Sequence, residues 1–254
     1  MISFKISTAT CINDRNIGKP NEDLICIDES NGLFLILDGI TRPHEEYDGS
    51  GDSYACQIDR ILRDNIMPEA SKLAGLEPTA LEIALREVLV NANAAIMPYR
   101  NSKTMAEWRF TPGAVGIAAV LSGNTLCCVW AGDCIGVHFS NGQRRLITRQ
   151  QTLAVAKSGY SKERIYDEVC NHPESDMAYG IFNGDPELAD LLESSFTEIK
   201  AGDTIMLCSD GLAGFLQNEP VERILSMSTD EMLTASAPYD KPYADDKAVI
   251  RIDF

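Results

Sequence analysis

The chain has 254 residues, a formal charge of −16 at pH 7, 44% hydrophobic residues and 24% charged residues. This length is enough to bury a sizeable core, and the composition is ordinary for a globular protein. The excess of negative charge argues against nucleic acid and anionic membranes as partners, because both are bound through cationic surfaces.

Two further properties indicate the compartment. No stretch approaches the roughly 20 unbroken apolar residues that a membrane helix needs, and the N-terminus lacks the apolar segment and cleavage site of a secretory signal. The eight cysteines include no C-x-x-C pair, and several lie in apolar runs. We therefore expect a cytoplasmic protein with reduced thiols.

The N-terminal part of the chain predicts three strands followed by two helices. The third strand is the clearest, because five apolar residues stand between Gly32 and Asp38, as is typical of a strand buried on both faces. Pro68 is expected to end the first helix, and Thr79 with Glu82 has the spacing of a capping box at the start of the second. The predicted strands cover residues 2–8, 24–27 and 33–37, and the predicted helices cover 50–66 and 79–96.

The chain returns to strands after Pro112. Turn signals at 122–124 and at Asn141 indicate that the four strands between 114 and 148 form an antiparallel meander. Residues 150–176 are mixed and polar and are expected to form a flap, with weak helical patterns at 153–156 and 161–166. Helices are predicted from Asp185 and after Glu219 and Thr229. The predicted strands cover 114–121, 126–130, 134–139, 144–148, 196–199, 204–208 and 248–252.

Together these elements predict an α+β fold with mainly antiparallel strands. No linker, internal repeat or low-complexity stretch divides the chain. We therefore expect one domain that covers residues 1–254.

Acidic residues occur where predicted strands begin or end. A single Asp-Gly after a strand would indicate only a turn, but the pattern is repeated. The acids that follow apolar runs are Asp38, Asp133 and Asp210, and those that precede strands are Glu22, Asp23, Asp245 and Asp246. Since the end of one antiparallel strand lies beside the start of its neighbour, these side chains can share one edge of the fold.

Such a cluster of carboxylates indicates a metal site. Like charges at this density repel one another unless a cation lies among them. Ligand sets made only of oxygen suit Mg²⁺ or Mn²⁺, whereas zinc is disfavoured because no histidine or cysteine cluster accompanies the acids. Two such ions can share a bridging carboxylate and activate a water for in-line attack on a phosphoryl group.

The acidic segments, taken together, resemble the protein phosphatase 2C family of metal-dependent Ser/Thr protein phosphatases. They occur in the order of the family and span nearly the whole chain, and the stretch from 202 to 212 is the most specific. The matching segments are NED at 21–23, LDG at 37–39, AGDC at 131–134, GDTIMLCSDGL at 202–212 and DDKAVI at 245–250.

The resemblance implies a four-layer α-β-β-α sandwich, in which two antiparallel sheets are flanked by helix pairs and the metal centre lies at one edge. It implies that Asp38 bridges two Mg²⁺ or Mn²⁺ ions and that the carbonyl of Gly39 binds one of them. Asp210 and Asp245 would complete the shell of the other ion.

The remaining acids have implied roles close to these ions. Glu22 and Asp23 would act partly through water, and Asp133 with Asp210 would hold a third, weaker ion. The attacking group would be a metal-bound water rather than a protein nucleophile. The implied substrate is phosphoserine or phosphothreonine in a protein, and we expect a monomer.

The chain departs from the family pattern at the phosphate-binding positions. Ile40 and Thr41 follow Gly39 where the family usually has glycine with histidine or methionine, and the arginine expected before Asn21 is absent. Lys19 and Arg42 are the nearest candidates to neutralise a phosphate. The departures leave open an alternative, a catalytically inactive binding or regulatory module.

Two other phosphatase classes fit the sequence less well. The haloacid dehalogenase motif needs a second aspartate two positions after the first, where this chain has Ile40. Cysteine-dependent phosphatases need an arginine six positions after the nucleophile, and none of the eight cysteines has one. The three histidines, His44, His138 and His172, are scattered and are interpreted as surface or structural residues.

Overall fold

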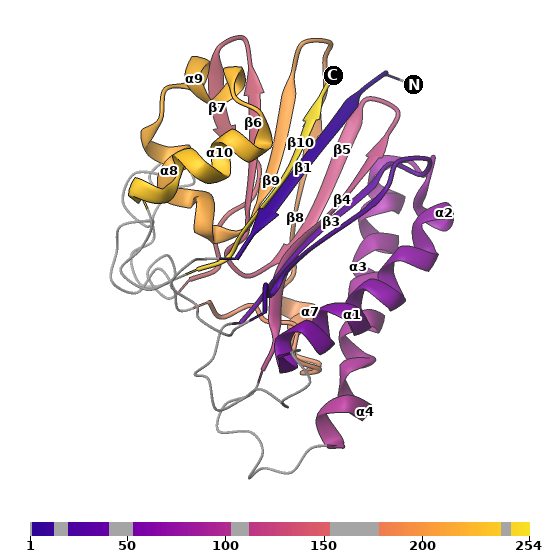
Figure 1. Cartoon of the computed structure of the whole chain (residues 1–254). Helices are drawn as coiled ribbons and strands as arrows, with labels where there is room; N and C mark the ends of the chain where they lie inside the picture. Colours follow the sequence, from indigo (N-terminus) through magenta and orange to yellow (C-terminus); the bar gives the residue numbers. More distant parts are fainter. Residues whose placement is uncertain (1, 13–19, 41–52, 103–111, 153–177, 240–244) are drawn as a thin grey trace.

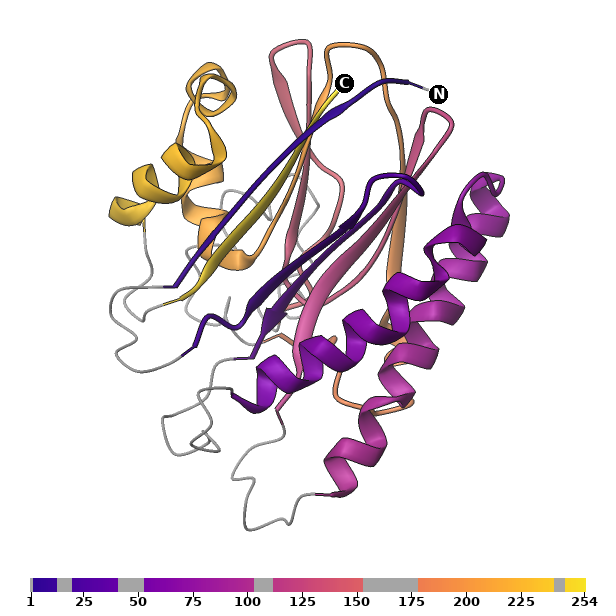
Figure 2. The same ribbon diagram turned by 45° about the vertical axis from the view of Figure 1, so that its right-hand side comes forward.

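The computed structural model describes residues 2–12, 20–40, 53–102, 112–152, 178–239 and 245–254. These residues form two antiparallel five-stranded sheets packed face to face, with helices on both outer sides (Figure 1). Figure 2 shows the same four layers after a turn of 45°. The predicted α+β sandwich is therefore confirmed.

Sheet 1 has the strand order β2-β3-β4-β5-β8, and sheet 2 has the order β1-β10-β9-β6-β7. The strands of sheet 1 are β2 Asp23–Asp28, β3 Leu33–Gly39, β4 Ala114–Ser122, β5 Thr125–Ala131 and β8 Glu193–Glu198. Those of sheet 2 are β1 Lys5–Cys11, β10 Lys247–Asp253, β9 Thr204–Cys208, β6 Ile135–Ser140 and β7 Gln143–Leu146.

Helices cover the outer face of each sheet (Figure 1). Those on the side of sheet 1 are α1 Tyr54–Ile66, α2 Ala70–Leu73, α3 Pro78–Ala94, α4 Ile96–Asn101 and α7 Leu188–Leu191. Those on the side of sheet 2 are α8 Ala213–Asn218, α9 Val221–Ser226 and α10 Thr229–Ala235. Short 3-10 turns lie at Met67–Glu69, Asp210–Leu212 and Ala237–Tyr239.

The strand β3 is buried on both faces, as its apolar run predicts. Leu35 and Leu37 pack against the helices of the outer layer, together with Ile58 of α1. Phe34 and Ile36 face the other way and pack between the two sheets. This strand therefore belongs to two hydrophobic cores, and its end is fixed in position by both.

The first helix begins later than its periodicity predicts. Ser53 caps α1 by accepting a hydrogen bond from the Cys56 amide at 3.1 Å. The buried side chains of Ile58, Leu62 and Ile66 follow at helical spacing, and the helix ends just before Pro68. The helix axis is thus set by a cap at one end and an apolar stripe along the sheet.

Two predictions about local structure were wrong. The strands between 114 and 148 do not form one meander, because β4 and β5 pair in sheet 1 while β6 and β7 pair in sheet 2. Thr79 is not a cap, since α3 begins at Pro78, where the missing N–H of proline costs nothing. The helix predicted from Asp185 is present as the short α7, although it begins later, at Leu188. The helical patterns at 153–156 and 161–166 lie outside the described residues.

The described part of the chain has two further features. Its seven cysteines are all free thiols. No helix there combines the length and the hydropathy that crossing a membrane requires.

Candidate metal centre

The end of β3 and the start of β2 place two aspartates side by side. The strands are antiparallel, and Asp38 lies directly opposite Asp23 in the register. By alternation along β3, Asp38 has the same orientation as Phe34 and Ile36, so its side chain faces the space between the sheets. The other neighbour of Asp38 is Val115 on β4, which leaves the carboxylate without a cationic partner from its own sheet.

Asp38 is the centre of the acidic cluster. It is only 9% exposed. Burial raises the pKa of Asp38 well above its ordinary value, and the nearby carboxylates raise it further. These neighbours, from the strongest effect to the weakest, are Asp23, Asp210, Asp245 and Asp133. The structure therefore gathers around Asp38 the aspartates that lie far apart in the sequence.

Hydrogen bonds tie the two sheets together at this edge. The hydroxyl of Ser209 donates to Asp23 Oδ2 at 2.7 Å and accepts from the amide of Ala248 at 2.8 Å. The amide of Glu22 donates to Asp246 Oδ2 at 2.9 Å. Glu22 and Asp23, at the start of β2, are thus held against the segments next to β9 and β10 that carry Asp210 and Asp245.

The glycines after two of the aspartates are required by close contacts. A Cβ atom at Gly39 would lie 2.8 Å from the Cβ atoms of both Ala55 and Glu22. A Cβ atom at Gly211 would lie 2.2 Å from the carbonyl oxygen of Asp246. The Asp-Gly pairs therefore allow the backbones of neighbouring segments to approach the acidic edge.

Two glutamines hold the turn that carries Asp133. The side chain of Gln151 accepts a hydrogen bond from the Gly132 amide through Oε1 at 2.9 Å. The backbone N–H of Gln151 donates to the Gly132 carbonyl at 2.8 Å. Gln150 donates from Nε2 to the Asp133 carbonyl at 3.0 Å. Gly132 has φ +88°, a conformation that favours glycine. The turn is therefore fixed by side chains that come from just after β7.

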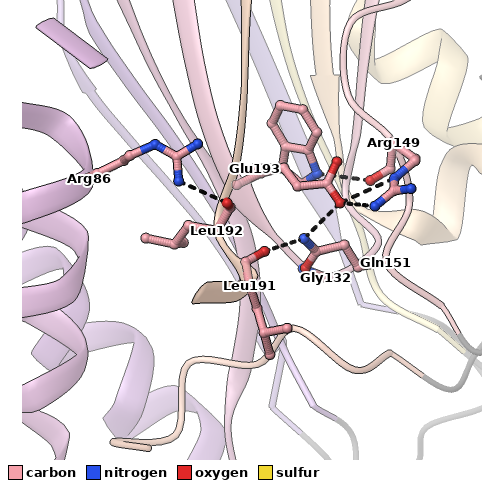
Figure 3. A network of polar contacts seen from close by, with 8 residues as sticks. Arg86, Gly132, Arg149, Gln151, Leu191, Leu192 and Glu193 are labelled. Carbon is pink, nitrogen blue, oxygen red and sulfur yellow. Dashed lines mark hydrogen bonds and ion pairs between the residues drawn. The ribbon is translucent and has the colours of Figure 1, made fainter. Parts of the chain in front are cut away.

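The same glutamine connects this turn to sheet 1 (Figure 3). Gln151 Nε2 donates to the Leu191 carbonyl at 2.5 Å and to Glu193 Oε1 at 3.2 Å. Glu193 also pairs with Arg149. Figure 3 shows Gln151 between Gly132 and the segment Leu191–Glu193, so one buried amide joins three parts of the chain.

The other site predictions have mixed outcomes. Lys19 and Arg42 lie outside the described residues, so their proposed contact with phosphate is not described. His138 is a buried structural residue, because its Nε2 lies 2.9 Å from Asp203 Oδ2. Among the residues that the structure describes, no three His, Cys, Asp or Glu side chains converge into a ready-made cation site.

Sequence reasoning missed one acid near the cluster. Asp59 of α1 is 2% exposed, and its Oδ1 atom has no hydrogen-bond partner. Burial raises its pKa well above the ordinary value, and Asp23 and Glu22 raise it further. The signal was present, because Asp59 lies on the apolar stripe of the predicted helix, four residues after Ala55 and three before Leu62.

Comparison with known proteins agrees with the sandwich fold. No protein-family model matches the chain. The chain is 24% identical over 183 residues to the serine/threonine phosphatase stp of Listeria monocytogenes, an alignment that covers 70% of this chain and 69% of that protein.

Solved structures of phosphatases have the same fold. The serine/threonine phosphatase Stp1 from Staphylococcus aureus superposes with a TM-score of 0.78 at 16% identity and covers 100% of this chain and 96% of that one. The catalytic domain of the serine/threonine protein phosphatase PstP, in complex with two manganese ions, gives 0.65 at 19% identity over 98% and 97%. The chain thus has the fold of the metal-dependent Ser/Thr phosphatases, and the resemblance seen in its sequence is confirmed at the level of the fold.

Proposed function

We propose that the chain is a metal-dependent phosphomonoester hydrolase that dephosphorylates phosphoserine and phosphothreonine in proteins. The observation that carries this proposal is the buried Asp38 with four other aspartates around it. It lies at the edge of a sandwich shared with Ser/Thr phosphatases. The Listeria monocytogenes relative described above is also named a Ser/Thr phosphatase. No observation favours the inactive binding module.

The donor set fits hard divalent cations. It consists of carboxylate oxygens with no histidine or thiolate among the proposed ligands, which favours Mg²⁺ or Mn²⁺ over zinc. The manganese ions of the PstP structure support two ions. A third ion at Asp133 and Asp210 is part of the proposal. The residues that would hold two ions are Asp38, Asp210 and Asp245, together with the carbonyl of Gly39.

The residues of the chain would orient the reaction. When bound, the cations would supply an activated water and neutralise the oxygens of the phosphoryl group. Ser209 holds Asp23 in one orientation by donating to Oδ2, and Gln150 and Gln151 hold the backbone at Asp133. Glu22 and Asp23 would act on the ions partly through water. Lys19 and Arg42 are proposed to neutralise the phosphate of the substrate.

The wider context of the protein is also part of the proposal. We expect residues 1–254 to act as one catalytic domain, because β1 and β10 from opposite ends of the chain pair with each other. We expect it to work as a monomer. We also expect a cytoplasmic location, because the described cysteines are free thiols, as is usual in reducing compartments.

The test is hydrolysis of p-nitrophenyl phosphate and of phosphoserine and phosphothreonine peptides with Mn²⁺ or Mg²⁺. EDTA should abolish the activity. Asp38→Asn should lower kcat by about a thousandfold. The bridging ligand holds the cations, and these contribute several kcal/mol of charge stabilisation in the transition state. Asp190→Asn, the same change at an exposed position of α7, is the control and should leave kcat unchanged. Activity that survives both EDTA and Asp38→Asn would refute the mechanism.

The phosphate-binding residues can be tested separately. Lys19→Ala is expected to raise KM for phosphoesters with a smaller effect on kcat, because a cation that contacts the substrate in both the ground and transition states contributes uniform binding. Steady-state kinetics with p-nitrophenyl phosphate measure both constants. An unchanged KM would remove Lys19 from the site.

A further inference from the structure

Asp59 differs from the other acids of the centre because it comes from a helix. It lies on the buried face of α1, on the same side of the helix as the buried residues Ala55 and Leu62. All the proposed metal ligands come instead from strand ends or from the loops beside them. A charged residue in an apolar stripe is costly unless it has a partner or a function.

The carboxylate of Asp59 is incompletely paired where the structure describes its surroundings. The side chain is 2% exposed, and Oδ1 is buried without a hydrogen-bond partner. Buried polar atoms of native proteins nearly always have a partner, in the protein or in a bound water or ion. The orphaned oxygen therefore indicates a ligand that the protein atoms alone do not supply.

Contacts of α1 place Asp59 at the acidic edge. One turn earlier, Cys56 donates from Sγ to the carbonyl of Asn21 at 3.5 Å. Ala55 packs closely over Gly39, since a Cβ atom at Gly39 would lie 2.8 Å from the Ala55 Cβ atom. The start of α1 therefore lies against the start of β2, as Figure 2 also shows. The helix continues from there with Asp59 on the same face as Ala55.

The nearest acids of Asp59 are proposed members of the metal centre. Asp23 and then Glu22 are the charged groups with the strongest influence on it, ahead of Arg60. Glu22 alternates with Leu24 and Cys26 along the chain, and these two side chains face the helical layer. Glu22 and Asp59 therefore approach each other from the sheet and from the helix.

We propose that Asp59 is an additional residue of the metal centre. Its carboxylate would hydrogen-bond to a water bound to the divalent cation on the Glu22 side of the acidic edge. This inference rests on the metal centre of the proposed function. It adds a helix-borne carboxylate to a ligand set that otherwise comes from strand ends. It also explains why an acid is kept in the apolar stripe of α1.

The test is Mn²⁺ binding, measured by calorimetry on the full chain. Asp59→Asn keeps the shape of the side chain but removes its charge, and it should weaken the affinity for Mn²⁺ by about 10- to 100-fold, as loss of an outer carboxylate typically does. Asp59→Ala is the second variant, in case the amide disturbs folding. Asp64→Asn is the matched control on the exposed side of the same helix and should bind as the native protein does.

Thermal melting in EDTA separates this role from a structural one. If Asp59 serves the cation, the metal-free variants melt no lower than the native protein, while the rise in Tm caused by Mn²⁺ is reduced. Variants that melt several degrees lower in EDTA and bind Mn²⁺ within about twofold of the native affinity would overturn the inference, because they define a packing role.

The outcomes also distinguish this inference from the proposed function. If the native chain binds Mn²⁺ but hydrolyses no phosphoester, the proposed function fails while the role of Asp59 is still decided by its isotherm. If the native chain binds no Mn²⁺, both proposals are overturned.

Discussion

Two buried carboxylates of this fold have opposite surroundings. Asp38 lies among other aspartates, and both burial and these charges raise its pKa well above the ordinary value. Asp203 is also shielded from solvent, at 4% exposure, although fewer protein atoms surround it than surround Asp38. Burial raises the pKa of Asp203, but hydrogen bonds from Ser140 and His138 outweigh that effect, so the net shift is downward.

Between two acids that are both shielded from solvent, the neighbouring charges and hydrogen-bond donors distinguish a structural acid from a functional one. Asp203 faces His138 Nε2 at 2.9 Å and accepts from the Lys200 amide at 3.0 Å. Its charge is therefore satisfied within the protein. Asp38 is surrounded by charges of its own sign, which is the arrangement expected where a cation is to be bound.

Removing the partner of Asp203 should have the largest effect on stability. His138→Ala leaves a buried carboxylate without one of its two side-chain partners, so the free energy of unfolding should fall by about 3–5 kcal/mol. Urea unfolding monitored by circular dichroism measures this loss. His138→Gln retains an N–H donor and should cost less. Equal stability of His138→Ala and the native protein would show that the two acids do not differ as described.

The turn at Asp133 offers a smaller change. Gln151→Ala leaves the Gly132 amide and the Leu191 carbonyl without their side-chain partner, so it should destabilise the protein by about 1–3 kcal/mol. Gln143→Ala, at an exposed position of β7, is the control and should change stability by less than about 0.5 kcal/mol. Equal losses from the two variants would contradict the role of Gln151.

The pH dependence of the metal-free protein should separate the two acids most finely. A raised pKa in the folded state means that the folded Asp38 holds its proton more tightly, so its contribution favours folding below pH 3.8 and is lost as pH rises toward its folded pKa. Asp203 has a lowered pKa, so its contribution is present above pH 3.8 and is lost on further acidification. Each group changes stability by at most about 1.4 kcal/mol per pH unit.

Melting in EDTA across pH 3–8 checks these signs. Asp38→Asn should flatten the loss of stability on raising the pH, whereas Asp203→Asn should flatten the loss at low pH. A metal-free Asp38→Asn protein with the native pH profile would contradict the electrostatic account of the cluster.

Much of the centre could be predicted because its signals are local. An apolar run followed by Asp-Gly marks the end of a buried strand, and this holds for Asp38. The pairing of Asp23 with Asp38 follows from the short connection between two antiparallel strands. The resemblance of the segments to known phosphatases implied the two-sheet sandwich, which the structure has.

What could not be predicted depends on contacts between distant segments. The turn at Gly132 is not a hairpin, and it sends the chain from sheet 1 to sheet 2, which a local pattern does not show. Gln150 and Gln151 were assigned to a polar flap, although both are buried against that turn. Asp59 was not predicted as a site residue, because the helix that contains it was identified from the spacing of its apolar residues alone.

The most direct test of the central claim is calorimetric titration of Mn²⁺ into the native chain and into Asp38→Asn. We predict that the native chain binds at least two ions and that Asp38→Asn loses the tighter binding, because Asp38 is the proposed bridge between them. An Asp38→Asn protein that binds Mn²⁺ with the native stoichiometry and affinity would contradict it.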